Sequence, residues 1–176
     1  MKNYYSEKPI VPYKRTQVEM PVVIQEIKKT DFPVEVKRAA YMVFRKESGN
    51  GMSGINFNFS GLQADAGRWP AQYDRLISGV VQTKENGTGK VRLFIAFNNL
   101  ADSLFMLMDR LQARGLFVGS HVDMPKLKIN MAISNIDQFA RAYKKCWAAG
   151  SNAAEPTGDD LKGFRSMYKQ AITIFP

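Results

Sequence analysis

Glu47 is the residue whose type and position most directly suggest chemistry. It ends a segment whose apolar residues, Val36, Ala40, Val43 and Phe44, recur at the spacing of one helix face. Glu47 follows Val43 by four residues and Phe44 by three, so it falls on the same inward face. Burial and the helix dipole both disfavour a negative charge near a helix C-terminus. We therefore expect a raised pKa for this carboxyl, which suits a general acid.

The same pattern is compatible with a plainer role for Glu47. Its side chain can turn into water, as most carboxylates do, or pair with Arg45 or Lys46. Residues 48–51 (Ser-Gly-Asn-Gly) end the helix directly after it. Whether Glu47 is a general acid or an ordinary surface charge depends on the elements that surround it.

Composition limits the class of protein. The 176 residues suffice for one compact domain, and 45% hydrophobic residues argue against disorder. The net charge of +9 favours an anionic polymer as partner, either nucleic acid or a bacterial cell wall. Nucleic acid ranks last, because the basic residues are scattered and no nucleic-acid-binding motif is present.

Cofactors and membrane segments are not expected. One cysteine, Cys146, and one histidine, His121, exclude an internal disulfide and argue against a zinc site. No apolar run approaches the ~20 residues of a transmembrane helix. The first residues lack the apolar core of a secretory signal, so we expect synthesis in the cytoplasm.

The elements that position Glu47 follow from the pattern of the chain. Residues 1–30 are expected to form an arm, and residues 31–176 a single domain. Within the arm, residues 22–24 are expected to form a short strand or to pack along the domain. The first helix is expected from about Asp31 to Glu47.

A small antiparallel sheet is expected next, at about 55–97. Residues 55–65 alternate as a strand or extended loop does, and two β-branched strands follow at 76–84 and 90–97. Asn86-Gly87 between these strands predicts a hairpin turn.

Three helices are expected after the sheet, at about 98–114, at about 134–149, and from Thr157 or Asp159 onward. Ser134, with Asp137 three residues later, is expected to cap the second of them. Residues 116–130 are expected to be irregular.

This order of elements resembles the lysozyme-like superfamily. Glu47-Ser48-Gly49, followed by Gly61-Leu62-Gln63, is similar to the Glu-Ser and Gly-Leu-Met-Gln motifs of lytic transglycosylases and goose-type lysozymes, without the Met. Residues 58–62 (Asn-Phe-Ser-Gly-Leu) resemble the Asn-x-Phe-Gly-Ile motif of flagellar and autolysin-type glucosaminidases, with one insertion. The resemblance covers roughly residues 31–120. It implies an α+β, mainly helical fold with the sheet between the catalytic helix and three later helices.

The resemblance implies that Glu47 protonates the leaving oxygen of a glycosidic bond in peptidoglycan. A second catalytic group is left open. Asp65 follows the Gly-Leu-Gln segment, and Glu85 lies at the hairpin where glucosaminidase-type relatives place a second acid. Either can instead be a turn residue. A mechanism with one glutamate, as in lytic transglycosylases, is also open.

Substrate contacts are expected from the residues between these acids. Trp69 and Tyr73 are expected to stack on sugars, and Asn58, Ser60 and Gln63 to hydrogen-bond N-acetyl or hydroxyl groups. Arg68 is expected to meet a lactyl or peptide carboxylate. Core packing is the alternative for Trp69 and a surface salt bridge for Arg68. Phe57 and Phe59 are expected in the core.

The sequence therefore predicts a peptidoglycan glycosidase that needs no cofactor or metal. A phage lysin or virion-associated protein is the expected context, with an injected toxin as another. Two roles are open for the arm: it lies on its own domain, or it attaches the protein to a larger phage or secretion assembly. The alternative is a lysozyme-like component of a phage particle that binds the wall or builds the particle without catalysis. The bond cleaved stays open.

Overall fold

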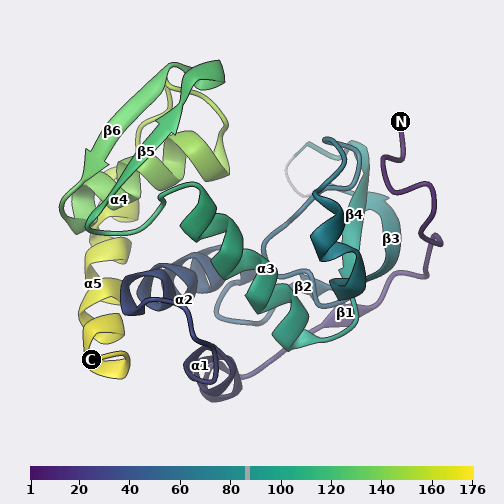
Figure 1. The fold of residues 1–176 in the computed structure, drawn as a ribbon, viewed down its shortest axis with the longest axis horizontal. Helices are drawn as coiled ribbons and strands as arrows, with labels where there is room; N and C mark the ends of the chain where they lie inside the picture. Colours follow the sequence, from purple (N-terminus) through teal and green to yellow (C-terminus); the bar gives the residue numbers. More distant parts are fainter. Residues whose placement is uncertain (86–87) are drawn as a thin grey trace. The chain divides into compact units, whose positions relative to one another are not determined.

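A computed structural model describes residues 1–85 and 88–176 (Figure 1). The fold is mixed α+β, as predicted, and its sheets are small, antiparallel and two-stranded. The chain divides into two compact units. Unit 1 comprises residues 1–27 and 43–106, and unit 2 comprises residues 28–42 and 107–176. None of the helices in the described residues is long and apolar enough to cross a membrane.

The centre of unit 1 is the predicted hairpin. Strands β3 (Ile77–Lys84) and β4 (Val91–Phe97) pair antiparallel, with Val80 opposite Ile95. Both of these side chains are fully buried, as β-branched residues on an inward face should be. The short 3₁₀ helix η1 (Ala71–Leu76) leads into β3. Asn86 and Gly87 of the predicted turn lie outside the described residues.

Other segments of unit 1 cover both edges of this hairpin. Along β3, Val11 N–H donates to the Val80 carbonyl, and Val80 N–H donates to the Pro9 carbonyl, each at 2.9 Å. Along β4, Ile95 N–H donates to the Leu62 carbonyl at 3.0 Å. The backbone groups at each edge are thus paired within the chain, which protects the hairpin from pairing with another molecule.

The N-terminal segment contains a helix that the sequence analysis missed. The strand expected at 22–24 is wrong, because these residues belong to α1 (Met20–Lys28). Val23 and Ile27, four residues apart, are its fully buried side chains. Pro21 suggested a break, yet proline is tolerated in the first turn of a helix, where its missing N–H has no partner to lose.

The remaining segments before the hairpin are short. Strand β1 (Arg15–Thr16) pairs antiparallel with β2 (Gly54–Ile55). Of the strand or extended loop predicted at 55–65, Ile55 belongs to β2. The division of the chain at residue 30 stays a prediction.

The first predicted helix is confirmed as α2 (Val34–Ser48). The inward stripe of Val36, Ala40, Val43 and Phe44 is fully buried. Helix α3 (Leu100–Ala113) follows the hairpin, as predicted. The boundaries between the two units fall at the end of α1, between Ile27 and Lys28, and inside α2 and α3.

Unit 2 contains a second hairpin, formed by β5 (Ser120–Met124) and β6 (Ile129–Ile133). The prediction that 116–130 is irregular is therefore wrong. Less and more exposed positions alternate along both strands, with Val122, Ile129 and Ile133 buried, but each strand has only five residues, which is short for a pattern to be recognised. Their connection is a 3₁₀ turn, η2 (Pro125–Leu127), followed by Lys128 at φ 55°. Its sequence lacks the Asn-Gly signal of a tight turn.

Two helices complete unit 2. Helix α4 (Ile136–Tyr143) continues as a π-helical turn, η3 (Lys144–Ala148), and α5 (Gly158–Ile174) packs on it through Phe164, 5.6 Å from the Phe139 ring centre. Thr157 caps α5, as predicted. The predicted cap at Ser134 is wrong, because Asn135 accepts the hydrogen bond from Gln138 N–H.

Candidate functional site

Glu47 lies half-buried in the last turn of α2. The next residue, Ser48, is fully buried; its hydroxyl donates to the Phe44 carbonyl at 2.6 Å and accepts from Gly51 N–H at 2.8 Å. Gly51 has φ +85°, and a β-carbon there would fall 2.1 Å from the Val18 carbonyl oxygen. The sequence after Glu47 therefore turns the chain sharply and fixes the backbone that carries the carboxylate.

A second contact joins α2 to the loop that follows. The ring of Phe59 packs 5.0 Å from the ring of Phe44, one turn before Glu47. Phe59 is in the core, as predicted, whereas Phe57 is half-exposed, so its predicted place in the core is wrong. Ser60, a predicted substrate contact, is also half-buried on this loop.

Asn58 holds the loop against β4. Its side-chain amide donates to the Leu62 carbonyl at 2.8 Å and to the Ile95 carbonyl at 2.9 Å, and its oxygen accepts from Leu62 N–H at 3.0 Å. The side chain is buried. Because both amide hydrogens bond to backbone, the geometry gives Asn58 a structural role that the sequence analysis did not foresee.

Gln63 and Glu85 lie together with Asp65 and Arg92, a group we call the hairpin cluster. Gln63 Nε2 donates to Glu85 Oε1 at 2.9 Å, and the Thr88 hydroxyl donates to Glu85 Oε2 at 2.6 Å. The Thr88 hydrogen bond, and then Arg92 and Gln63, hold the pKa of Glu85 below its usual range. Glu85 is therefore ionised at neutral pH, which fits charge stabilisation or a base better than an acid.

Arg92 links the two predicted second acids. Its Nη1 is 3.7 Å from Asp65 Oδ2, and its Nε is 3.8 Å from Glu85 Oε2. The Asp65 side chain is 4% exposed and that of Glu85 is 26% exposed. Asp65 Oδ1 is buried without a hydrogen-bond partner among the described residues. Sequence reasoning missed Arg92; a charged residue within the apolar strand 91–97 was the available signal.

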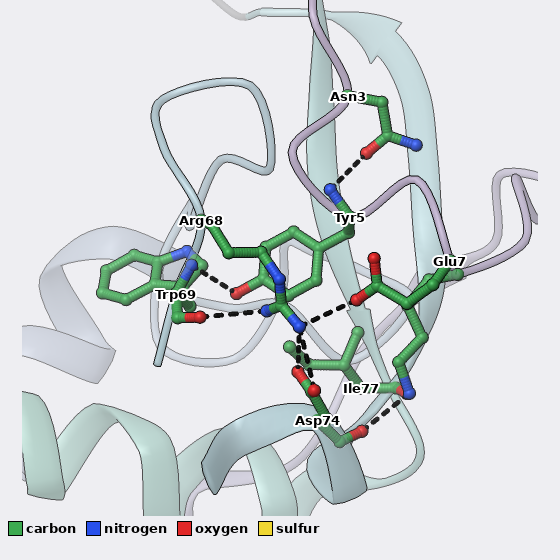
Figure 2. A network of polar contacts seen from close by, with 8 residues as sticks. Asn3, Tyr5, Glu7, Arg68, Trp69, Asp74 and Ile77 are labelled. Carbon is green, nitrogen blue, oxygen red and sulfur yellow. Dashed lines mark hydrogen bonds and ion pairs between the residues drawn. The ribbon is translucent and has the colours of Figure 1, made fainter. Parts of the chain in front are cut away.

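Arg68 belongs to a different network, which Figure 2 shows. Its guanidinium donates to both carboxylate oxygens of Asp74, at 2.7 and 2.8 Å, and to Glu7 Oε1 at 2.8 Å. The group also lies over the Tyr5 ring, 4.1 Å from its centre. Of the two roles considered for Arg68, the structure shows a salt bridge, and this bridge joins the N-terminal segment to the loop before β3.

The two predicted stacking residues lie beside this network. Trp69 N–H donates to the Tyr5 hydroxyl at 3.1 Å, and its indole Nε1 donates to the Gln63 carbonyl at 3.3 Å. Burial raises the pKa of the Tyr5 phenol to about 12. Tyr73 is buried in the core of unit 1. Trp69 is half-buried, so its exposed portion is what remains for a ligand.

Among the described residues, no group of three or more His, Cys, Asp or Glu side chains is arranged so that it could hold a metal ion. Comparison with known proteins adds no relative: no protein-family model matches the chain, and no curated protein or solved structure gives a significant match.

Proposed function

We propose that this chain cleaves the glycan strands of peptidoglycan, as a glycoside hydrolase or lytic transglycosylase with Glu47 as the general acid. The observation that supports it is the fixation of Glu47 at the end of α2 by the Ser48 hydrogen bonds. The loop and the hairpin cluster that follow belong to the same compact unit. A general acid, an ionised carboxylate and amide groups thus occur in one unit, in the order that the resemblance implies.

In this mechanism Glu47 transfers its proton to the leaving oxygen as the glycosidic bond breaks. The positive charge that develops on the sugar ring needs a partner. Glu85 fits that role better than Asp65, because its side chain is more exposed, 26% against 4%. Its lowered pKa keeps it ionised at neutral pH. Arg92 holds both carboxylates in place. A neighbouring acetamido group of the substrate is the alternative partner, and it would make Glu85 dispensable.

The test is the release of soluble fragments from purified peptidoglycan by wild type, Glu47→Gln and Glu85→Gln. Loss of the general acid is expected to slow release by about 10³-fold. Glu19→Gln, an exposed acid in the N-terminal segment, is the matched control and should retain full release. The new ends identify the bond cleaved: reducing N-acetylglucosamine, reducing N-acetylmuramic acid or anhydro-muramic acid. Equal release by wild type and Glu47→Gln would contradict the assignment.

A second candidate is a non-catalytic component that binds the wall or builds a phage particle. It is favoured by the ion pairs of both Asp65 and Glu85 with Arg92, which offset the charge of the two candidate catalytic carboxylates. Binding of wild type to walls without any release of fragments would support it. In either case a phage lysin or virion-associated protein is the proposed context.

A further inference from the structure

Phe57 adopts a backbone conformation that its side chain disfavours. It is the third of the four residues of a tight turn, 55–58, which is closed by Asn58 N–H donating to the Ile55 carbonyl at 2.8 Å. Asn56 and Phe57 have φ values of 48° and 63°. A turn with two left-handed residues favours Asn and Gly. Asn56 fits this preference, whereas a bulky aromatic residue at such a φ is an outlier.

Hydrogen bonds from neighbouring segments to the backbone and to Asn56 hold this conformation. Phe57 N–H donates to the Thr16 hydroxyl at 3.1 Å. Asn56 accepts from Lys14 N–H through its side chain at 2.7 Å, and from Phe97 N–H through its carbonyl at 3.0 Å. Strain of this kind persists where the surrounding contacts over-determine the backbone, and it occurs often at binding sites. A glycine would satisfy the same contacts without strain.

The Phe57 ring also differs from its aromatic neighbours. Phe44, Phe59, Phe94 and Phe97 are buried, whereas Phe57 is half-exposed. Among the residues that the structure describes, its ring has no aromatic partner. The turn is nevertheless connected to the helix of Glu47, because Phe59, two residues after Phe57, packs against Phe44 in α2. The strained position thus presents an aromatic surface from a segment attached to the helix of Glu47.

We propose that Phe57 binds the glycan by stacking its ring on the apolar face of an N-acetylhexosamine. This inference rests on the proposed function and adds a binding residue to it. An aromatic face covers the C–H groups of a sugar ring, while nearby amides hold its polar rim. The strained backbone is retained because glycine, the residue that the turn favours, cannot supply the ring.

The experiment measures stability and glycan binding separately. Binding to insoluble peptidoglycan is measured with Glu47→Gln, which prevents turnover, with and without Phe57→Gly or Phe57→Trp. Phe57→Gly is expected to keep or raise the Tm and to weaken binding roughly tenfold. Phe57→Trp should retain binding. Lys128→Gly is the control, because it relieves another positive φ, at 55° in unit 2, and should leave binding unchanged.

The outcomes separate this inference from the proposed function. A lower Tm for Phe57→Gly would show that the ring serves core packing, and unchanged binding would show that it does not contact the glycan; either overturns the inference. If wild type releases no fragments but binding depends on Phe57, the catalytic proposal fails and the stacking role stands. If wild type releases no fragments and Glu47→Gln does not bind peptidoglycan at all, both fail.

Discussion

Asn58 shows how a polar side chain next to a proposed site can serve the fold. Replacing Asn58 by Ala removes the partner of the Leu62 N–H and of the Ile95 carbonyl, whereas the Leu62 carbonyl keeps its hydrogen bond from Ile95 N–H. We expect the free energy of unfolding to fall by about 3 kcal/mol, since each buried, unsatisfied group is costly. Urea denaturation measures this. Ser60→Ala should change it by less than about 0.5 kcal/mol. Unchanged stability with weaker glycan binding in Asn58→Ala would instead support direct substrate contact.

Glu85 is expected to make the free energy of unfolding depend on pH in the acidic range. Its folded-state pKa lies below the unfolded value because Thr88, Arg92 and Gln63 favour the carboxylate. Its stabilising contribution is therefore present above the unfolded pKa of about 4.3 and is lost as pH falls through the lower, folded value. We expect Glu85→Gln to reduce the loss of stability on acidification below about pH 4.3. Denaturant unfolding of both proteins at stepped pH measures it; identical acid profiles would show that the contacts contribute nothing.

At the scale of elements, the N-terminal segment is held by the network in Figure 2. Arg68 bonds to Asp74 and Glu7 and covers the Tyr5 ring. Exposed ion pairs contribute little singly, but here Nη2 of Arg68 meets both Asp74 oxygens and Glu7 while the guanidinium covers an aromatic ring, and such a combined network contributes more. We expect Arg68→Ala to cost about 1–2 kcal/mol and to speed hydrogen exchange at the Val11 amide. Glu7→Gln removes only an exposed partner and should cost less than about 0.5 kcal/mol.

Tyr5 makes the same element sensitive to high pH. Burial raises its pKa to about 12, so the folded state holds the phenol proton more tightly than the unfolded chain. Stability from Tyr5 is therefore complete below about pH 10 and falls as pH rises toward 12. We expect Tyr5→Phe to lose less stability than wild type over this range. An absorbance titration that placed all tyrosines near pH 10 would contradict the burial of this phenol.

The elements differ in how far the sequence predicts them, for physical reasons. Helix α2 was predictable because Val36, Ala40, Val43 and Phe44 mark a helix face, and β3 and β4 because their residues are β-branched. The hairpin of β5 and β6 was not, because its strands have only five residues each and no tight-turn signal connects them. Within the candidate site, the roles of Asn58 and Arg68 depend on partners far along the chain, 37 and 61 residues away, which local patterns do not report.

At the scale of the whole molecule, charge is distributed over both units. Unit 2 has 14 basic and 8 acidic side chains, and unit 1 has 11 and 8, so the net charges are +6 and +3. Many of the basic groups are paired, as Lys145 is with Glu155 and Arg165 with Asp137. A net positive charge spread in this way favours long-range attraction to a polyanion over a single specific anion site.

If the partner is the cell wall, we expect the affinity to have a salt-dependent electrostatic part and a part that comes from contacts with the glycan. Binding of Glu47→Gln to intact walls should weaken several-fold when salt rises from about 50 to about 200 mM, because screening reduces attraction to wall phosphates and carboxylates. Walls stripped of teichoic acids should bind less tightly and with a shallower salt dependence, since only the glycan contacts and the acidic peptides remain. Cosedimentation at stepped salt measures both. Salt-dependent binding to duplex DNA, without any binding to stripped walls, would instead favour the nucleic-acid alternative. The protein would then recognise its partner through electrostatic attraction alone.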